Sequence, residues 1–338
     1  MKIKEIVSAL NEITGGRVVA DLSDITLGKN PFVVMKSSNI PGKEVIEIPG
    51  LVFGDPEKEV KKVAITMTLT EQSIELAGAT GVDLIVAHHP VADAANSGGV
   101  TLKNYLGLYG ISVIELHEAF HGLHPGISYI HGHRAYKVDI SYGGIPGNIM
   151  YVGKVLEGIN TLKDIIERIN SFMDIKREFL SLEKEKSVYG EKDMVNSATG
   201  ALAEVFLGEP DSKVEYILHI FPHTGFEPVH LLKAKSEYPE IDTVICSISR
   251  VKRESPLVKK AEELGLNFIC GNSHAYEIFE NGLPLALALK SYVKDDIEIR
   301  IFREKVYSFP VSSFGSDRIK EYADYISQNY LIKNPCGR

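Results

Sequence analysis

The sequence predicts an α/β protein built from two similar units. Residues 73–90 and 257–274, far apart in the chain, share one plan: a helix, a glycine, a short apolar strand and then histidine. Helices that alternate with short apolar strands are typical of sheets covered by helices. We therefore expect two α/β lobes that face each other as a pseudo-repeat. A chain of 338 residues, 44% of them hydrophobic, can bury a sizeable core.

The first elements follow from hydrophobic spacing. Ile3, Ile6 and Leu10 recur at helical intervals, which predicts an N-terminal helix that ends at the glycines 15–16. Residues 63–69 alternate apolar side chains with alanine and threonine, as a strand does. Residues 70–80 then read as a helix that ends at glycine 81, before the apolar strand DLIVA.

The second half repeats this alternation. Thr161 and Asp164 have capping-box spacing and predict a helix start. Residues 175–194 are dense in charge without a sustained period, so we expect an excursion or an exposed hairpin. Residues 214–221 indicate a strand. Ser255 begins a helix that is followed by the apolar strand 266–270.

We expect three regions along the chain. Residues 1–150 form an N-terminal α/β lobe, residues 239–338 form a C-terminal α/β lobe, and residues 151–238 connect them and complete the second lobe. The net charge of −8 and the absence of a basic cluster disfavour a nucleic-acid partner. Apolar runs stop short of the ~20 residues of a membrane span, which predicts a cytoplasmic protein. The three cysteines lack CxxC spacing, so any metal would rely on histidine and carboxylate.

Histidines carry the strongest chemical signal. His88 and His89 directly follow a buried strand, and ligands of open α/β sheets bind at carboxyl strand ends. As mere packing this pair is costly, because each buried ring needs a hydrogen-bond partner. We interpret the pair as metal-binding or catalytic.

Two further groups have ligand spacing. His117 and His121 share a face if their segment is helical, and His274 lies three residues before Glu277. Imidazoles with a carboxylate suit one or two divalent ions of Zn, Fe, Mn, Co or Ni. Five further histidines are interpreted as structural or surface residues; these are His131, His133, His219, His223 and His230. His124, beside a proline, is interpreted as part of a loop. The acidic residues near the site are interpreted as solvated; these are Asp93, Glu115 and Glu118.

Residues 59–91, which contain the HHP motif, resemble the signature segment of the Ngg-one-interacting-factor-three-like family, also called GTP cyclohydrolase I type-two homologues. The opening helix, the stretch 111–127 and the stretch 265–289 support the resemblance. It implies two interleaved α/β lobes with mixed sheets and a two-metal site in the cleft between them. It also implies a homo-oligomer, a toroidal hexamer.

The resemblance also implies ligands, residue by residue. His88 and His89 match the adjacent ligand histidines of the family, while HEAFH places His117 on a histidine and His121 on a metal-binding aspartate. The terminal motif keeps Glu277 as a ligand but places serine 273 on a histidine, so we expect His274 to take that role. Losing the aspartate removes one negative charge, which makes a single-metal site or a softer ion a real alternative.

These observations predict a divalent-metal-binding protein. If it is an enzyme, we expect hydrolysis, in which the metal lowers the pKa of a bound water and Glu277 or His117 handles protons. The resemblance implies a nucleotide-like substrate. The alternative is a non-catalytic metal carrier or an oligomeric scaffold.

Overall fold

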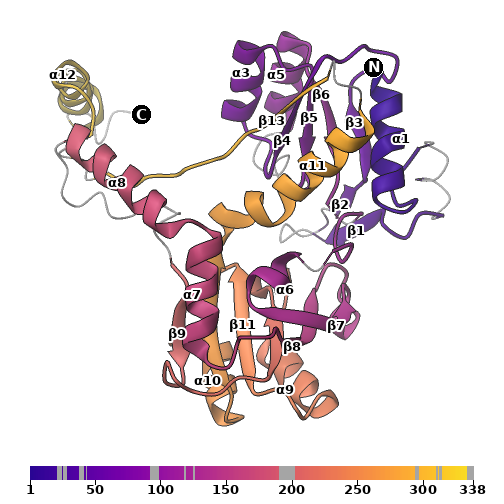
Figure 1. Cartoon of the computed structure of the whole chain (residues 1–338). Helices are drawn as coiled ribbons and strands as arrows, with labels where there is room; N and C mark the ends of the chain where they lie inside the picture. The colour runs from indigo at the N-terminus through magenta and orange to yellow at the C-terminus, as the bar shows by residue number, and fades with distance from the viewer. Residues whose placement is uncertain are drawn as a thin grey trace. The chain divides into compact units, whose positions relative to one another are not determined.

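The computed structural model (Figure 1) describes residues 1–20, 25, 29–37, 42, 44–91, 99–117, 119–124, 126–189, 202–293, 297–309, 311 and 314–332. The chain divides into two compact units. The first contains Met1–Met173 and Leu202–Glu304, and the second contains Asp174–Ala201 and Lys305–Arg338. Both predicted sheets lie in the first unit.

The first sheet has five strands in the order β13-β4-β5-β6-β3. They are β13 (Glu298–Ile301), β4 (Lys62–Thr66), β5 (Leu84–Ala87), β6 (Ser112–Glu115) and β3 (Gly50–Phe53). Four of them run parallel, and the edge strand β3 is antiparallel to β6. All four residues of the central strand β5 are buried, as in parallel sheets covered on both faces. A separate antiparallel pair joins β1 (Val34–Ser37) to β2 (Glu44–Glu47).

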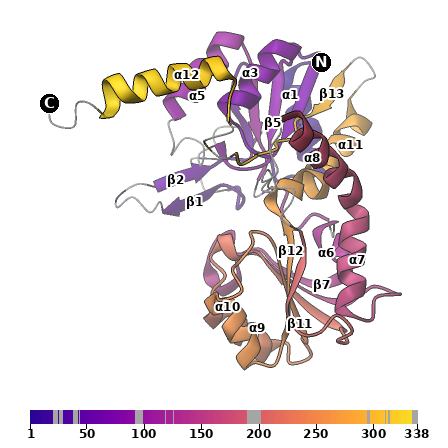
Figure 2. The same cartoon turned by 90° about the vertical axis from the view of Figure 1, so that its left-hand side faces the viewer.

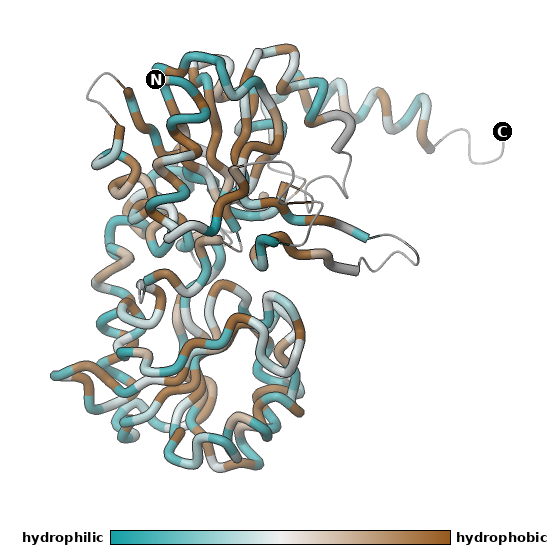
Figure 3. The backbone as a smooth tube through the Cα atoms, turned by 90° about the vertical axis from the view of Figure 1, so that its right-hand side faces the viewer, coloured by the Kyte–Doolittle hydropathy of each residue, from teal (hydrophilic) through white to brown (hydrophobic). Residues whose placement is uncertain are grey.

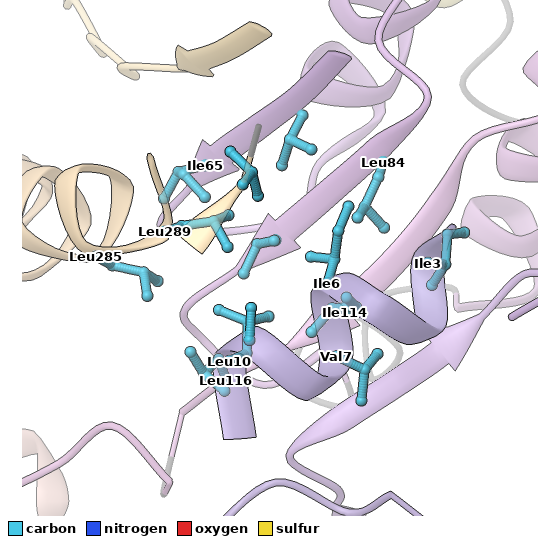
Figure 4. Packing of buried hydrophobic residues seen from close by; sticks show 14 of the residues in the cluster. Ile3, Ile6, Val7, Leu10, Ile65, Leu84, Ile114, Leu116, Leu285 and Leu289 are labelled. Carbon is cyan, nitrogen blue, oxygen red and sulfur yellow. The ribbon is translucent and has the colours of Figure 1, made fainter. Parts of the chain in front are cut away.

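Helices cover both faces of this sheet. One face carries α1 (Ile3–Ile13) and α11 (Leu283–Tyr292), and the other carries α3 (Glu71–Thr80) and α5 (Gly99–Tyr109). Figure 4 shows the α1 side chains, among them Ile6 and Leu10, against Ile65 and Ile114 of the strands and Leu289 of α11. The predicted apolar stripe of the first helix is therefore confirmed as core.

The first predicted helix–strand unit is confirmed in detail. The Thr70 hydroxyl accepts a hydrogen bond from Ser73 N and caps α3. Gly81 ends the helix with φ 69°, a left-handed conformation that glycine adopts without steric penalty. Strand β5 follows, and its backbone leads directly into His88. Strand β4, which precedes α3, ends at Thr66, three residues before the end of the strand predicted over residues 63–69.

The second sheet has six strands in the order β7-β8-β10-β11-β12-β9. They are β7 (His133–Asp139), β8 (Met150–Val155), β10 (Tyr216–Ile220), β11 (Thr243–Ile248), β12 (Asn267–Ser273) and β9 (Glu204–Leu207). The three central strands β10, β11 and β12 are parallel, and the outer strands pair antiparallel. The mixed α/β class predicted from the sequence is confirmed.

The helices of this lobe are α6 (Gly126–Ile130), α7 (Leu162–Phe172), α9 (Pro228–Glu237) and α10 (Pro256–Glu263). Both predicted caps form: the side chain of Thr161 accepts from Asp164 N, and that of Ser255 accepts from Val258 N. Side chains of α9 and α10 pack with the central strands in one apolar cluster, and Figure 3 shows hydrophobic residues concentrated along these strands.

Segments exchange between the two sheets. Strand β7 begins at His133 and joins the second sheet, whereas β13, near the end of the chain, joins the first. The chain therefore passes from one sheet to the other and returns, so the two lobes are interleaved. The predicted boundaries at 150 and 238 stay predictions, because this exchange spreads each lobe over distant parts of the chain.

In its described part, the second compact unit contains α8 (Ile175–Tyr189) and α12 (Asp317–Ile326), both visible in Figure 2, and the π-helical segment Ser327–Ile332. The predicted hairpin over 175–194 is therefore wrong for its described part, which is helical. More than half of its residues are glutamate, lysine or leucine, which favour helix, and Ile175 and Leu182 are buried on one face. Among the described residues, every helix is too short or too polar to cross a membrane.

Candidate metal centre

The candidate site lies where parallel strands of both sheets end. His88 and His89 follow β5, Thr68 follows β4 and His117 follows β6, so the three neighbouring strands deliver polar side chains to one edge of the first sheet. The backbone hydrogen bonds between β4 and β5 continue one residue beyond the end of β5, because His88 N donates to Thr66 O at 3.0 Å. Adjacent strand ends therefore hold both histidines in place.

The segment that contains His274 and Glu277 lies against the pair His88 and His89, although almost 190 residues separate His89 from Glu277. Glu277 follows β12 of the second sheet, and one of its oxygens lies 2.9 Å from His89 Nε2. Its other oxygen lies 3.3 Å from His88 Nε2. These three side chains form a group that could hold a metal ion. Both His88 and Glu277 are buried, while His89 is 15% exposed.

Neighbouring side chains orient this group. The Thr68 hydroxyl lies 2.9 Å from His89 Nδ1, which leaves Nε2 directed at Glu277. The Asn281 amide donates to Glu277 Oε1 at 3.0 Å, one turn further along the chain. Partners on the remote side of a ligand are what metal sites use to set ring orientation.

Burial and charge leave the group ready to bind a cation. Burial lowers the pKa of His88 to about 4, so its imidazole is neutral at physiological pH. Burial alone would raise the pKa of Glu277, but the positive field of His89 and hydrogen bonds from both histidines hold it well below its ordinary value. A neutral imidazole and an ionised carboxylate are the forms that coordinate metals.

His117 and His121 lie close to this group. Their rings are 4.3 Å apart, and each lies 5.5 Å from the ring of His88. The condition of a helical segment is not met, since the described residues there form turns in which Phe120 N donates to His117 O. Gly122, with φ 70°, bends the chain directly after His121. The turn still brings the two imidazoles together.

His117 has a buried carboxylate behind it. Its Nδ1 lies 3.1 Å from an oxygen of Glu47, which is 1% exposed at the end of β2. A histidine that donates its remote nitrogen to a carboxylate is the usual arrangement of metal-ligating imidazoles. This pair supports His117 as a ligand, and spacing along the sequence gives no signal for Glu47.

His274 occupies the outer side of the group. Its Nε2 lies 3.4 Å from Glu277 Oε2, and its ring stacks on His89 with centroids 4.6 Å apart. The side chain is 52% exposed. The structure therefore brings His274 to the place expected for it, next to the glutamate, while Ser273 ends β12.

The donor set fits a divalent ion. Bonds of about 2.1 Å in a tetrahedral site place neighbouring ligand atoms about 3.4 Å apart. The distances from the Glu277 oxygens to Nε2 of His88 and His274, 3.3 and 3.4 Å, equal this value, and the distance to Nε2 of His89 is shorter, at 2.9 Å.

A pocket opens beside the group, with an empty volume of about 510 Å³ that includes its mouth. His89 and Glu277 line it from one side, and residues after β10 and β11 line it from the other. His223, interpreted from the sequence as structural, is one of these lining residues. The sequence signal that could have identified His223 is its position shortly after the end of a parallel strand, β10.

Glu115 was interpreted from the sequence as solvated, but the structure shows it buried. It is 2% exposed, and its carboxylate accepts hydrogen bonds from Ile48 N at 3.1 Å and Val91 N at 2.9 Å. Burial raises its pKa to about 7. The side chain thus ties two loops around the histidines. Asp93 and Glu118 lie outside the described residues.

Three of the remaining histidines form a separate buried cluster. His133 Nε2 lies 3.2 Å from His219 Nδ1, and His219 Nε2 lies 2.6 Å from the Ser247 hydroxyl. The ring of His131 packs edge-on against His219. A Cβ at Gly271 would come within 2.8 Å of His131, so glycine is needed there. Their interpretation as packed core residues agrees with this geometry.

The fold and the site define a two-lobed α/β protein with a histidine–carboxylate group at the carboxyl ends of its parallel strands. Residues 35–97 match the model of the family described as Duf34/NIF3 (NGG1p interacting factor 3). The resemblance to this family is therefore confirmed. None of the curated proteins matches the chain.

Solved structures share the fold. Reduced HcgD from Methanocaldococcus jannaschii has 17% sequence identity and a TM-score of 0.54, over 89% of this chain and 97% of that one. A Bacillus cereus protein related to NIF3 has 13% identity and a TM-score of 0.57, over 92% and 99%. A hypothetical protein from Staphylococcus aureus has 15% identity and a TM-score of 0.53, over 94% and 99%. At these identities the likeness concerns the fold alone.

Proposed function

We propose that this protein binds a divalent metal ion through His88, His89 and Glu277 and uses it for hydrolysis. The observation that carries the proposal is the meeting of two imidazoles and one carboxylate, within 3.3 Å, from distant parts of the chain. His117, His121 and His274 surround this group and are candidates for completing one metal site or a pair. The metal is one of Zn, Fe, Mn, Co or Ni.

The adjoining pocket favours catalysis over a purely structural metal. Structural sites surround the ion with protein ligands, whereas catalytic sites keep a position open. Here the pocket reaches both His89 and Glu277, so a substrate has access to the group. Held by His88, His89 and Glu277, a divalent ion would supply Lewis-acid chemistry here, which lowers the pKa of a bound water towards neutrality. His117, backed by Glu47, is positioned to exchange protons in the pocket.

A metal carrier is the second candidate, and one observation favours it. His274 is half exposed and lies next to Glu277, so it offers a ligand at the surface through which an ion can enter or leave. Rapid transfer of the ion to a chelator, without turnover of any ester or amide bond, is the result that distinguishes this role. The nucleotide-like substrate stays a proposal drawn from the family resemblance.

Elemental analysis tests the metal site with a matched pair of variants. Glu277→Gln keeps the shape of the side chain but removes its charge, and we expect the dialysed protein to lose most of its metal. Glu280→Gln makes the same carboxyl-to-amide substitution three residues further along, at an acid whose pKa burial raises to about 8 and which is therefore already uncharged, and it should retain the metal of the parent. His88→Ala with His89→Ala should behave as Glu277→Gln does. Parent-like metal content in Glu277→Gln and in the double variant would refute the site.

A further inference from the structure

Two cysteines of the second sheet lie directly opposite each other. Cys246 of β11 and Cys270 of β12 are register partners in a parallel pair of strands, which Figure 2 shows side by side. Both side chains belong to the apolar cluster that also contains residues of α9 and α10, so both thiols project from the same face of the sheet. Both cysteines are free and buried. The fold therefore creates a dithiol from residues that the sequence separates by a helix.

The two thiols interact directly. They share a hydrogen bond, which raises the pKa of Cys246 and lowers the pKa of Cys270. These directions mean that the Cys246 S–H donates and that the Cys270 sulfur accepts, so Cys270 is the sulfur that carries negative charge. The thiolate is the nucleophilic form of cysteine. Cys270 is therefore the reactive member of the pair, and Cys246 lies beside it.

A positive charge supports the Cys270 thiolate. The Arg250 guanidinium donates to the carbonyl oxygen of Gly271, the residue after Cys270, at 3.0 Å, and to Glu204 Oε1 at 2.9 Å. Its field lowers the pKa of Cys270, and the backbone N–H of Val251 donates a further hydrogen bond to the thiols. Cysteines that react with oxidants typically have a cationic neighbour and a second cysteine beside them. Cys270 has both.

The spacing of the strands fits a disulfide. Neighbouring strands lie about 4.7–4.9 Å apart, and the Cα atoms of a disulfide lie about 4.4–6.8 Å apart. Register partners can therefore be joined by rotation of their side chains, with the pairing of β11 and β12 kept. A metal site is the other common use of a thiol pair, and tetrahedral zinc takes four ligands. Among the described residues, these cysteines belong to no group of three side chains that could hold a metal.

A surface loop separates the dithiol from solvent. Val251 packs against the apolar cluster that contains both cysteines and is partly exposed. It belongs to residues 249–255, which connect β11 to α10 without helix or strand. Loops of this kind open locally at a free energy far below that of global unfolding. A small, uncharged oxidant can enter through such an opening.

We propose that Cys246 and Cys270 form a redox-active dithiol, which hydrogen peroxide closes to an intramolecular disulfide. The Cys270 sulfur attacks one peroxide oxygen, so an S–O bond forms, the O–O bond breaks, and hydroxide leaves with the proton of the thiol as water. The Cys246 sulfur then attacks the sulfenic sulfur, an S–S bond forms, the S–O bond breaks, and a second water leaves. Two thiols and one peroxide thus give one disulfide and two waters. This site is separate from the metal group and does not rest on the proposed function.

The full-length Cys336→Ser variant tests the proposal, because it retains Cys246 and Cys270 as its remaining cysteines. After hydrogen peroxide is added and then removed with catalase, we expect both thiols to be lost towards a maleimide in the denatured chain. The mass should fall by two hydrogen atoms, a digest without reductant should contain the two cysteines in one joined peptide pair, and dithiothreitol should restore both thiols. The proposal is overturned if both thiols persist in excess peroxide, or if they oxidise without this cross-link.

A matched pair of arginine variants tests the part played by charge. Arg250→Gln keeps an amide that can donate to Gly271 but removes the positive charge, and it should slow disulfide formation several-fold. Arg253→Gln, whose arginine also pairs with Glu204, at 3.2 Å, is the control and should react at the parent rate. Melting temperatures of both variants show whether the fold is kept. Equal rates in Arg250→Gln and the parent would overturn the role given to the Arg250 charge.

Discussion

Glu280 offers a stability measurement whose pH dependence can be worked out from the structure. Its side chain is fully buried in the π-helical segment Ile278–Gly282. One carboxyl oxygen accepts a hydrogen bond from Asn272 Nδ2 at 3.0 Å, and the other has no partner among the described residues. Burial raises the pKa of Glu280 to about 8, so the folded protein keeps this acid protonated at neutral pH.

The size of the effect follows from linkage. The unfolded chain ionises Glu280 near its ordinary pKa of 4.5, whereas the folded chain does so near 8. The favourable contribution is complete below pH 4.5 and is lost as the pH rises towards 8, because folding must then take up a proton. At about 1.4 kcal/mol per pH unit, the parent protein loses about 3 kcal/mol between pH 4.5 and pH 7.

Glu280→Gln removes this dependence. Glutamine is neutral at every pH and its carbonyl can still accept from Asn272. The variant should therefore match the parent near pH 4.5 and exceed its unfolding free energy by about 3 kcal/mol at pH 7. Urea unfolding followed by circular dichroism, at pH 5, 6, 7 and 8 with a chelator present, measures the difference. His131, whose Nδ1 lies 4.0 Å from Glu280 Oε1, does not interfere, because burial lowers its pKa to about 4, below the pH range measured. A difference that does not grow with pH would refute the reasoning.

Two further predictions concern the surroundings of the site. Glu47→Gln weakens the acceptor behind His117 and should lower metal affinity about 10–100-fold in a dye-competition titration; a lower melting temperature with unchanged affinity would show a structural role instead. We also propose that the protein is a homo-oligomer, a hexamer as its family resemblance implies, because α11 exposes Leu283, Leu287 and Tyr292. Light scattering should give a mass of several chains, and a monomer at micromolar concentration would contradict this.

Local chemistry made much of the fold predictable. The stripe of α1, the caps at Thr70, Thr161 and Ser255 and the turn at Gly81 depend on residues a few positions apart, so the printed sequence contains the whole cause. The charged stretch at the start of the second unit was expected as an excursion or a hairpin; it lies outside the first unit, but its described part is a helix, because helix propensity acts there without a sustained hydrophobic period.

The candidate site was predictable in part for the same reason. The pair His88 and His89 follows an apolar strand, and strand ends are where open sheets place ligands. Glu47, Thr68 and Asn281 carry no comparable signal, because each becomes important only through a contact with a residue elsewhere in the chain. His117 and His121 come together through a turn and not through a helix, because i,i+4 spacing alone does not distinguish a helix from a bend at glycine.

The α/β class, several helix and strand positions and the histidines at strand ends could be predicted from the chain alone. The fold was needed to show which strand ends face each other, that Glu277 meets His89, and that a pocket with neither lysine nor arginine in its described lining opens beside them. The difference lies in the sequence distance over which each interaction acts. Caps, turns and amphipathic stripes are settled by neighbours along the chain, whereas the exchange of β7 and β13 between the sheets depends on packing the whole core at once.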